Sequence, residues 1–136
     1  MQQFRKDEAD LYLRKAMEDV LLLEKLCFDQ EVSDAIWGFH AQQALEKLIK
    51  TQLVRSKISF PKSHDLSFLL DLMPEKDMAA FSEVHGDCDE LSPFAVAARY
   101  EDFLDVELHR DKLLAKIKKI CERLLSCKSW NPTVAD

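Results

Sequence analysis

Four side chains that donate hydrogen bonds or carry positive charge follow one edge of a predicted helix: His40, Gln43, Lys47 and Lys50. Their spacing of i, i+3, i+7 and i+10 places them in one stripe beside the apolar face of that helix. Ammonium and amide donors in a row can bind a phosphate or a carboxylate. Two plainer interpretations stay open. Glu46 and Lys50 have the spacing of an ordinary surface ion pair, and His40 can be a hydrogen-bonded residue at the edge of the core.

A second candidate is the pair Arg99 and Tyr100, which comes just before the last predicted helix. Arginine and tyrosine are frequent anchors of ligands and of protein interfaces. The same two side chains can equally fasten a break between helices to the rest of the protein. The sequence therefore nominates His40, Gln43, Lys47, Lys50, Arg99 and Tyr100 as ligand-binding residues.

Several other chemistries are excluded by residue type and spacing. The whole chain has two glycines, which are too few for a glycine-rich phosphate loop. No histidine has a glutamate three positions before it, so the Glu-x-x-His motif of di-iron bundles is missing. The cysteines, Cys27, Cys88, Cys121 and Cys127, form no Cys-x-x-Cys pair and are expected to be buried thiols. We therefore expect no bound metal and no cofactor.

Length and charge limit the class of protein. A chain of 136 residues, 47% apolar and 32% charged, is expected to form one domain over residues 1–136. The core is expected over about 5–126, with a frayed tail at 127–136. No apolar run is long enough to span a membrane and the first residues do not resemble a signal peptide, so we expect the cytoplasm.

The net charge of −6 is distributed unevenly along the chain. Residues 71–109 carry net −9 and residues 110–136 carry net +4. Such segregation can steer a protein partner or a second copy of the chain, or it can be solvated helix surface.

The elements that must position these residues are all predicted to be helical, because apolar residues recur at steps of three and four. We expect helices over 4–28, 34–56, 64–73, 75–91 and 102–127, with Ser33 and Ser63 as caps of the second and third. The predicted inward residues are Leu13, Met17, Val20, Leu23 and Cys27; Trp37, Ala41, Ala44, Leu45, Leu48, Ile49 and Leu53; Leu66, Leu69, Leu70 and Met73; Met78, Phe81 and Val84; and Val106, Leu113, Ile117, Ile120 and Leu124. The fold class is all-α: an antiparallel up-and-down four-helix bundle with an additional short helix.

Three segments in order carry a resemblance to a known family. They are FHAQQALEKLIKTQL at 39–53, SHDLSFLLDL at 63–72 and AARYEDF at 97–103, with AMEDV at 16–20 before them. Together they resemble the HEPN domain, a helical bundle of prokaryotes and higher eukaryotes proposed to bind nucleotides, over about residues 5–125. The positions that match its motifs are His40, Gln43, Ala44, Glu46, Lys47, Lys50, His64, Asp65, Leu66, Ala98, Arg99 and Tyr100.

The resemblance implies a five-helix bundle that pairs as a homodimer. It also implies a partner, because small prokaryotic members are often encoded beside a minimal nucleotidyltransferase in transferase or toxin–antitoxin complexes. We therefore expect a non-catalytic subunit that binds a nucleotide or a nucleotidyltransferase partner, with no membrane association.

The chain departs from the family at one motif. Many HEPN proteins are metal-independent ribonucleases with Arg-x(4–6)-His, but Arg99 meets Leu104, Asp105 and Val106 at that spacing. Arg14, Arg55, Arg110 and Arg123 have no suitably placed histidine either. Without an imidazole beside the guanidinium, activation of a 2′-hydroxyl lacks its proton carrier, so RNA is the less favoured substrate. The alternatives are a ribonuclease toxin that pairs Arg99 with His109 or His40 across a dimer, and a ligand-free helical adaptor that docks through 71–109.

Overall fold

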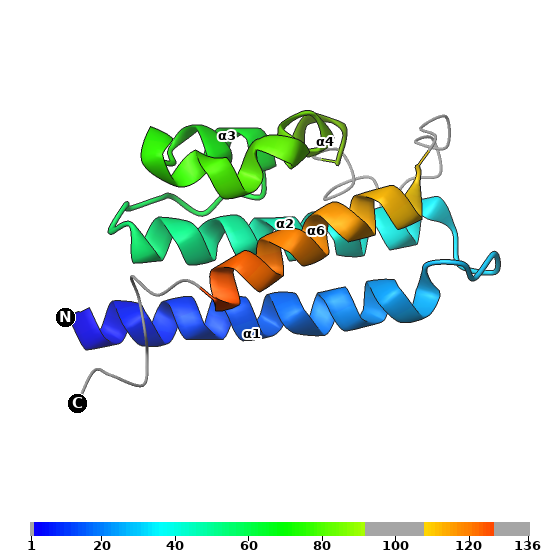
Figure 1. Ribbon diagram of the computed structural model, residues 1–136, viewed down its shortest axis with the longest axis horizontal. Helices are drawn as coiled ribbons and strands as arrows, with labels where there is room; N and C mark the ends of the chain where they lie inside the picture. Colours follow the sequence, from blue (N-terminus) through cyan, green and yellow to red (C-terminus); the bar gives the residue numbers. More distant parts are fainter. Residues whose placement is uncertain (1, 92–107, 127–136) are drawn as a thin grey trace.

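A computed structural model describes residues 2–91 and 108–126 of the chain, with side chains from Lys6 onward. Its elements in order are α1 (Gln2–Leu26), α2 (Asp34–Arg55), α3 (Leu66–Asp71), the 3-10 helix η1 (Glu75–Val84), α4 (His85–Leu91) and α6 (Arg110–Leu125). The described residues contain no strand. Figure 1 shows α1 and α2 side by side in opposite directions, with α6 laid across them and α3, η1 and α4 above α2. The predicted all-α bundle is confirmed.

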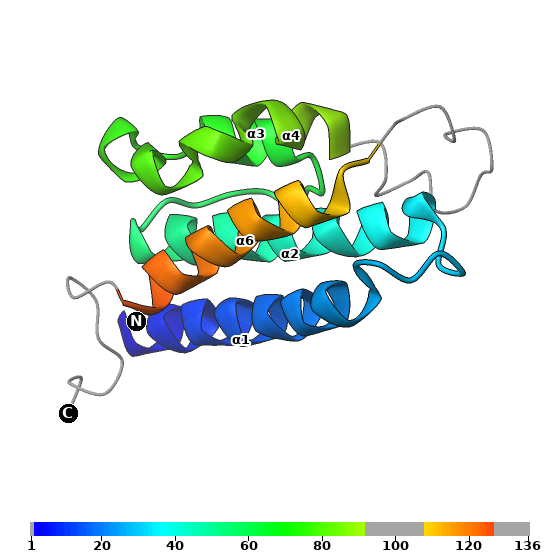
Figure 2. The same ribbon diagram turned by 45° about the vertical axis from the view of Figure 1, so that its right-hand side comes forward.

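The core lies between the apolar faces of α1, α2 and α6, as the periodicity predicts, and continues into the buried residues of α3, η1 and α4. Every inward residue predicted for α2 is buried, and so are those predicted for α3 and, within the described part, for α6. Met17 is the exception on α1, since its side chain is 42% exposed. Figure 2 shows α6 crossing α1 at an angle. Met17 lines an open pocket between these two helices together with Val20, Leu21 and Cys121.

The ends of α2 follow local chemistry. Ser33 is the N-cap as predicted, because its hydroxyl accepts a hydrogen bond from the Ile36 amide at 3.2 Å. At the other end Lys57 adopts φ 61°, and its amide donates to the Val54 carbonyl. The Ile58 amide donates to the carbonyl of Leu53, which completes a Schellman motif. A lysine therefore occupies a left-handed position that glycine normally fills.

The third helix starts later than predicted. Asp65, not Ser63, is its N-cap, since the Asp65 carboxylate accepts from the Phe68 amide at 3.1 Å. The Ser63 hydroxyl instead accepts from the Asp65 amide, which holds the turn before the cap. Two competing side-chain caps two residues apart explain the error of the sequence-based boundary.

One helix was predicted over 75–91, but the structure has two elements there. Residues 75–84 form a 3-10 helix and only residues 85–91 are α-helical. The apolar residues Met78, Phe81 and Val84 recur at a spacing of three, which matches the three residues per turn of a 3-10 helix. The spacing then changes to four at Cys88, where the α-helix continues.

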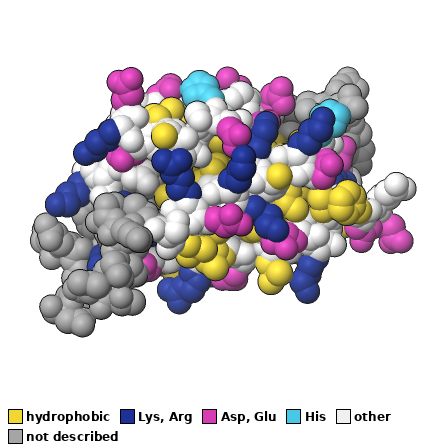
Figure 3. Space-filling view, viewed as in Figure 1, with side chains coloured by type: hydrophobic (Ala, Val, Ile, Leu, Met, Phe, Trp, Pro, Cys, Tyr) yellow, Lys and Arg dark blue, Asp and Glu magenta, His cyan; other side chains and the backbone are white. Residues whose placement is uncertain are grey.

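The last described helix, α6, begins at Arg110, and the two described residues before it, Leu108 and His109, are not helical. The predicted start at residue 102 lies outside the described residues. Two lysines of α6 pair with acidic residues of the neighbouring elements η1 and α4: Lys116 lies 3.0 Å from Asp87, and Lys119 lies 3.5 Å from Glu83. Figure 3 shows the two signs of charge mixed over this face. The charge segregation along the chain is thus neutralised in part within the fold.

Candidate functional site

Arg110 fixes the connection between α1 and α2. Its side chain, 13% exposed, lies over the Trp37 ring with 5.8 Å between guanidinium carbon and ring centroid. It donates to three carbonyls of the connection and to one carboxylate, those of Leu26, Asp29, Val32 and Asp34. Trp37 itself donates through Nε1 to the Leu23 carbonyl at 3.1 Å. These contacts set the relative position of α1 and α2, and so of the side chains between them.

The first half of the predicted stripe meets α1 at Asp19. Lys47 Nζ lies 2.6 Å from Asp19 Oδ2, and His40 Nδ1 lies 3.7 Å from Asp19 Oδ1. The His40 ring also packs edge-on against Phe39, with 5.3 Å between centroids. His40 Nδ1 is buried and has no hydrogen-bond partner within the described part of the chain. Asp19 therefore brings two donors of α2 together at the surface of the α1–α2 pair.

The second half of the stripe lies in a more deeply buried network. Lys50 is 8% exposed, and its ammonium lies 3.0 Å from Glu46 Oε2. The same ammonium stands over the rings of Tyr12 and Phe60, at 6.0 and 5.7 Å from their centroids. A buried ammonium needs such compensation, because transfer of a charge out of water is costly.

Glu46 is the centre of that network. Its Oε1 accepts from Gln42 Nε2 at 3.3 Å and lies 2.9 Å from His64 Nδ1. Gln42 Nε2 also donates to the His64 carbonyl at 2.8 Å, and Gln43 Nε2 donates to Gln42 Oε1 at 2.7 Å. The network thus attaches the connection before α3 to α2, and it occupies both Gln43 and Lys50 with internal partners.

The structure therefore divides the predicted ligand-binding residues. It brings His40 and Lys47 together at Asp19, and it places Gln43 and Lys50 in the Glu46 network. Arg99 and Tyr100 lie outside the described residues. His109 is exposed beside Arg110, and its proposed pairing with Arg99 lies outside them as well.

Asp19 entered the sequence analysis only within the segment AMEDV at 16–20, as part of the family resemblance, and not as a site residue. A signal was present: Tyr12 and Asp19, two turns apart, interrupt the same edge of the apolar stripe of the first helix. Both contact the polar stripe of α2, Tyr12 near Lys50 and Asp19 at Lys47.

Burial and nearby charge suppress ionisation of the phenol and the thiols. Burial, followed by the charges of Glu8 and Glu46, raises the pKa of Tyr12. Burial, followed by Asp87 and Asp89, raises the pKa of the Cys88 thiol to about 12. Burial also raises the pKa values of Cys27 and Cys121. Because the thiolate is the reactive form, these three thiols are poor nucleophiles at neutral pH.

The described ranges 2–91 and 108–126 contain neither a cluster of metal ligands nor a membrane-spanning helix. No three His, Cys, Asp or Glu side chains gather closely enough there to hold a metal ion. No helix among them combines the length and the apolar character needed to cross a membrane.

Comparison with known proteins gives one family match for this chain. The model of the HEPN domain matches residues 9–129, which cover most of α1 and all of α2, α3, η1, α4 and α6. Neither the curated proteins nor the solved structures include a match. The HEPN domain model spans nearly the whole chain and contains both the Asp19 cluster and the Glu46 network, so this chain belongs to the HEPN domain family.

Proposed function

We propose that this HEPN protein is a non-catalytic subunit of a cytoplasmic nucleotidyltransferase or toxin–antitoxin complex, and that it binds nucleotide phosphate through His40 and Lys47. The observation that carries the proposal is the meeting of these two side chains at Asp19. Both are part-exposed, and a lysine ammonium with three N–H groups keeps donors for a ligand after it has paired with one carboxylate oxygen.

The electrostatics of the cluster favour an anion of limited charge. Asp19 offsets the charge of Lys47, so the site is a polar anchor and not a broad basic surface. A nucleotide phosphate needs one or two such anchors, whereas an RNA backbone needs several cations along its length. This charge pattern therefore favours a nucleotide over RNA as the ligand of the site.

The other four predicted ligand-binding residues have different roles in the proposal. Arg99 and Tyr100 stay proposed ligand-binding residues on the sequence alone, since they lie outside the described residues. Gln43 and Lys50 support the site indirectly, because Gln43 already donates to Gln42 and Lys50 already donates to Glu46. The absence of an Arg-x(4–6)-His spacing in the sequence supports a subunit without ribonuclease activity of its own.

Calorimetric titration with ATP tests the phosphate site. We expect Lys47→Gln and His40→Gln each to weaken ATP binding at least about tenfold, the scale of one charge-assisted hydrogen bond. Lys116→Gln is the matched control, because Lys116 also joins two helical elements through an aspartate, Asp87, and lies on α6. Circular dichroism confirms that each variant is folded. Equal weakening by Lys47→Gln and Lys116→Gln, or no binding by the wild type, contradicts the site.

Affinity purification from the native cells tests the subunit role. A tag on this chain is expected to recover a small nucleotidyltransferase, identified by the native mass of the complex and the masses of its parts. Recovery of this chain alone, together with cleavage of RNA without added metal, would instead support the ribonuclease alternative.

A further inference from the structure

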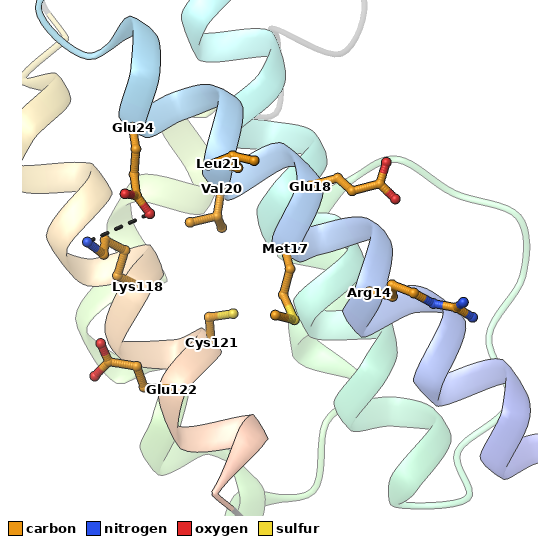
Figure 4. Close-up of a pocket in the computed structure, with 9 residues that line it drawn as sticks. All are labelled: Arg14, Met17, Glu18, Val20, Leu21, Glu24, Lys118, Cys121 and Glu122. Carbon is orange, nitrogen blue, oxygen red and sulfur yellow. Dashed lines mark ion pairs between the residues drawn. The ribbon is translucent and has the colours of Figure 1, made fainter.

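An apolar groove of about 500 Å³ runs between α1 and α6. Figure 4 shows Met17, Val20 and Leu21 on the α1 side of it, with Cys121 on α6 pointing toward Met17. Met17 and Leu21 are 42% and 55% exposed, so this apolar surface is open to a group that could cover it. Asp19 contacts α2 on another flank of α1, so the groove is separate from the proposed phosphate site.

The charged side chains that line the groove, two positive and three negative, do not balance. Glu24 and Lys118 form a pair, with 3.7 Å between Lys118 Nζ and Glu24 Oε1. The other three are Arg14, Glu18 and Glu122, whose side chains form no ion pair with another described residue. Two carboxylates and one guanidinium therefore remain. A segment that covers the groove is favoured if it brings a positive charge together with an apolar side chain.

The chain that follows α6 starts beside this groove. The helix α6 ends at Leu125 over the N-terminal half of α1 (Figure 1), and Glu122, one turn earlier, lines the groove. Residues 127–136 have the sequence CKSWNPTVAD and lie outside the described residues. They include one large aromatic side chain, Trp130, and a lysine two residues before it, Lys128. This segment thus supplies both the apolar group and the positive charge.

The distances allow the segment to return to the groove. At 1.5 Å per residue, Ser126 lies about 7.5 Å from Cys121 along the axis of α6. The four residues from Ser126 to Trp130 span up to about 14 Å when extended. Trp130 can therefore turn back over the apolar centre of the groove, while Lys128 stays beside Glu122 at the end of α6.

The sequence of the segment favours an extended path of this kind. Pro132 has no backbone N–H and disfavours helical torsions at Asn131, so α6 cannot simply continue through the segment. Asp136 is the other charged residue in it, six positions after Trp130. In an extended chain that separation is about 20 Å, which places the Asp136 carboxylate past the apolar centre and far from Lys128.

We propose that residues 127–136 fold back on their own chain and cover the α1–α6 groove, with the Trp130 ring on Leu21 and the Lys128 ammonium beside Glu122. Because the segment is tethered directly to α6, its effective concentration at the groove is in the millimolar range. The docked segment closes the groove to any other helix until it is displaced. It is thus a built-in competitor for this surface, in place of the frayed tail expected from the sequence.

This docking goes beyond the proposed function and does not depend on it. The HEPN domain match ends at residue 129, one position before Trp130, so the aromatic anchor belongs to this chain outside the matched region. The docked segment leaves His40 and Lys47 uncovered, because they contact Asp19 on another flank of α1. Docking and ATP binding are separate measurements, and either proposal can fail without the other.

Quenching of Trp130 fluorescence by acrylamide tests the docking on the full chain. The chain has two tryptophans and Trp37 is 1% exposed, so the wild-type signal minus that of Trp130→Phe isolates Trp130. We expect a quenching constant at least about threefold lower than that of the free peptide 127–136, as for a segment docked more than about two-thirds of the time. Equal quenching in protein and peptide overturns the proposal.

Two matched substitutions on α1 test whether the groove gives this protection. Leu21→Glu places a carboxylate at the apolar centre and is expected to raise the Trp130 quenching constant close to that of the peptide. Leu11→Glu is the control, since Leu11 is 48% exposed on the same helix but does not line the groove. Each variant is compared with the same variant carrying Trp130→Phe, and circular dichroism verifies its fold. Equal effects of the two substitutions would rule out the groove as the docking site.

Charge reversal tests the placement of Lys128. Lys128→Glu brings a third carboxylate to Glu18 and Glu122, so we expect it to raise the quenching constant of Trp130. The double variant Lys128→Glu/Glu122→Lys restores one attractive pair and is expected to regain the protection. If Lys128→Glu has no effect, or if the second substitution does not rescue it, the proposed register is wrong.

The dependence on protein concentration identifies the occupant of the groove. Docking within one chain gives the same protection of Trp130 over roughly a hundredfold range of concentration, because the tether fixes the effective concentration. Protection that appears only as the concentration rises would show that another copy of the chain covers the groove, and it would overturn the proposal.

Discussion

Replacement of Arg110 by alanine tests how far the fold depends on one side chain. The substitution removes donors from three backbone carbonyls in the α1–α2 connection and from Asp34, and it uncovers the Trp37 ring. Hydrogen bonds to charged groups contribute about 1.5–3 kcal/mol each, but exposed carbonyls recover water as a partner. The Asp34 pair, half exposed, adds little.

The better-buried contacts of Arg110 account for most of the expected loss of stability. The carbonyls of Leu26 and Val32 are the part-buried acceptors, and the stacking on Trp37 adds about 0.5–1 kcal/mol. We therefore expect Arg110→Ala to lower the free energy of unfolding by about 3–4 kcal/mol. For a chain of this length that corresponds to a fall in Tm of roughly 10–14 °C.

Urea unfolding followed by circular dichroism and tryptophan fluorescence measures this loss. Arg110→Lys is expected to recover less than half of it, because an ammonium cannot reproduce the fork of donors that reaches several carbonyls at once. Arg123→Ala, an exposed arginine on the same helix, is the control and is expected to stay within about 0.5 kcal/mol of the wild type. A loss below about 1 kcal/mol for Arg110→Ala would refute the reasoning.

Three further predictions concern stability. Lys57→Gly is expected to raise the free energy of unfolding by about 0.5–1 kcal/mol, measured by urea unfolding, because glycine has no Cβ to strain at φ 61°; a decrease would contradict this account. Glu46→Gln leaves the Lys50 ammonium buried without its counter-ion and is expected to cost about 3 kcal/mol, while the double variant Glu46→Leu/Lys50→Met is expected to lose less than the single one. The third prediction concerns pH. In the unfolded chain Cys88 ionises above its ordinary pKa of 9.0, whereas burial raises the pKa of the folded thiol to about 12. Between these values the unfolded state binds fewer protons than the folded state, so the free energy of unfolding falls as pH rises. Urea titrations at several pH values above 9 are expected to show a shallower fall in Cys88→Ala than in the wild type, and identical slopes would argue against the shift.

The sequence predicted well whatever depends on a long periodic face. The buried stripe of α2, from Trp37 to Leu53, follows from its spacing alone, because only one side of an amphipathic helix can face a core. Short elements were predicted less well, since two local signals competed at Ser63 and Asp65. The three-residue spacing of Met78, Phe81 and Val84 is typical of a 3-10 helix, but the sequence interpretation assigned this segment to an α-helix.

The candidate site was only half predictable for a different reason. His40 and Lys47 could be placed on one stripe by counting residues, but the partner that joins them, Asp19, belongs to another helix. Spacing along one helix also gives no measure of depth. Lys50 shares the stripe with Lys47 yet is buried against Tyr12 and Phe60, because the connection before α3 covers that end of α2.

The contacts of Arg110 also have a consequence for the order in which the chain assembles. The helices α1 and α2 are neighbours in sequence and can associate early, since pairing of nearby segments costs little loop-closure entropy. Arg110 lies 78 residues beyond Val32, whose carbonyl it binds. During synthesis from the N-terminus, the α1–α2 turn therefore emerges with its carbonyls in water and its apolar faces open. The turn acquires its final geometry only when α6 arrives, so the last described helix to be made completes the first connection of the fold.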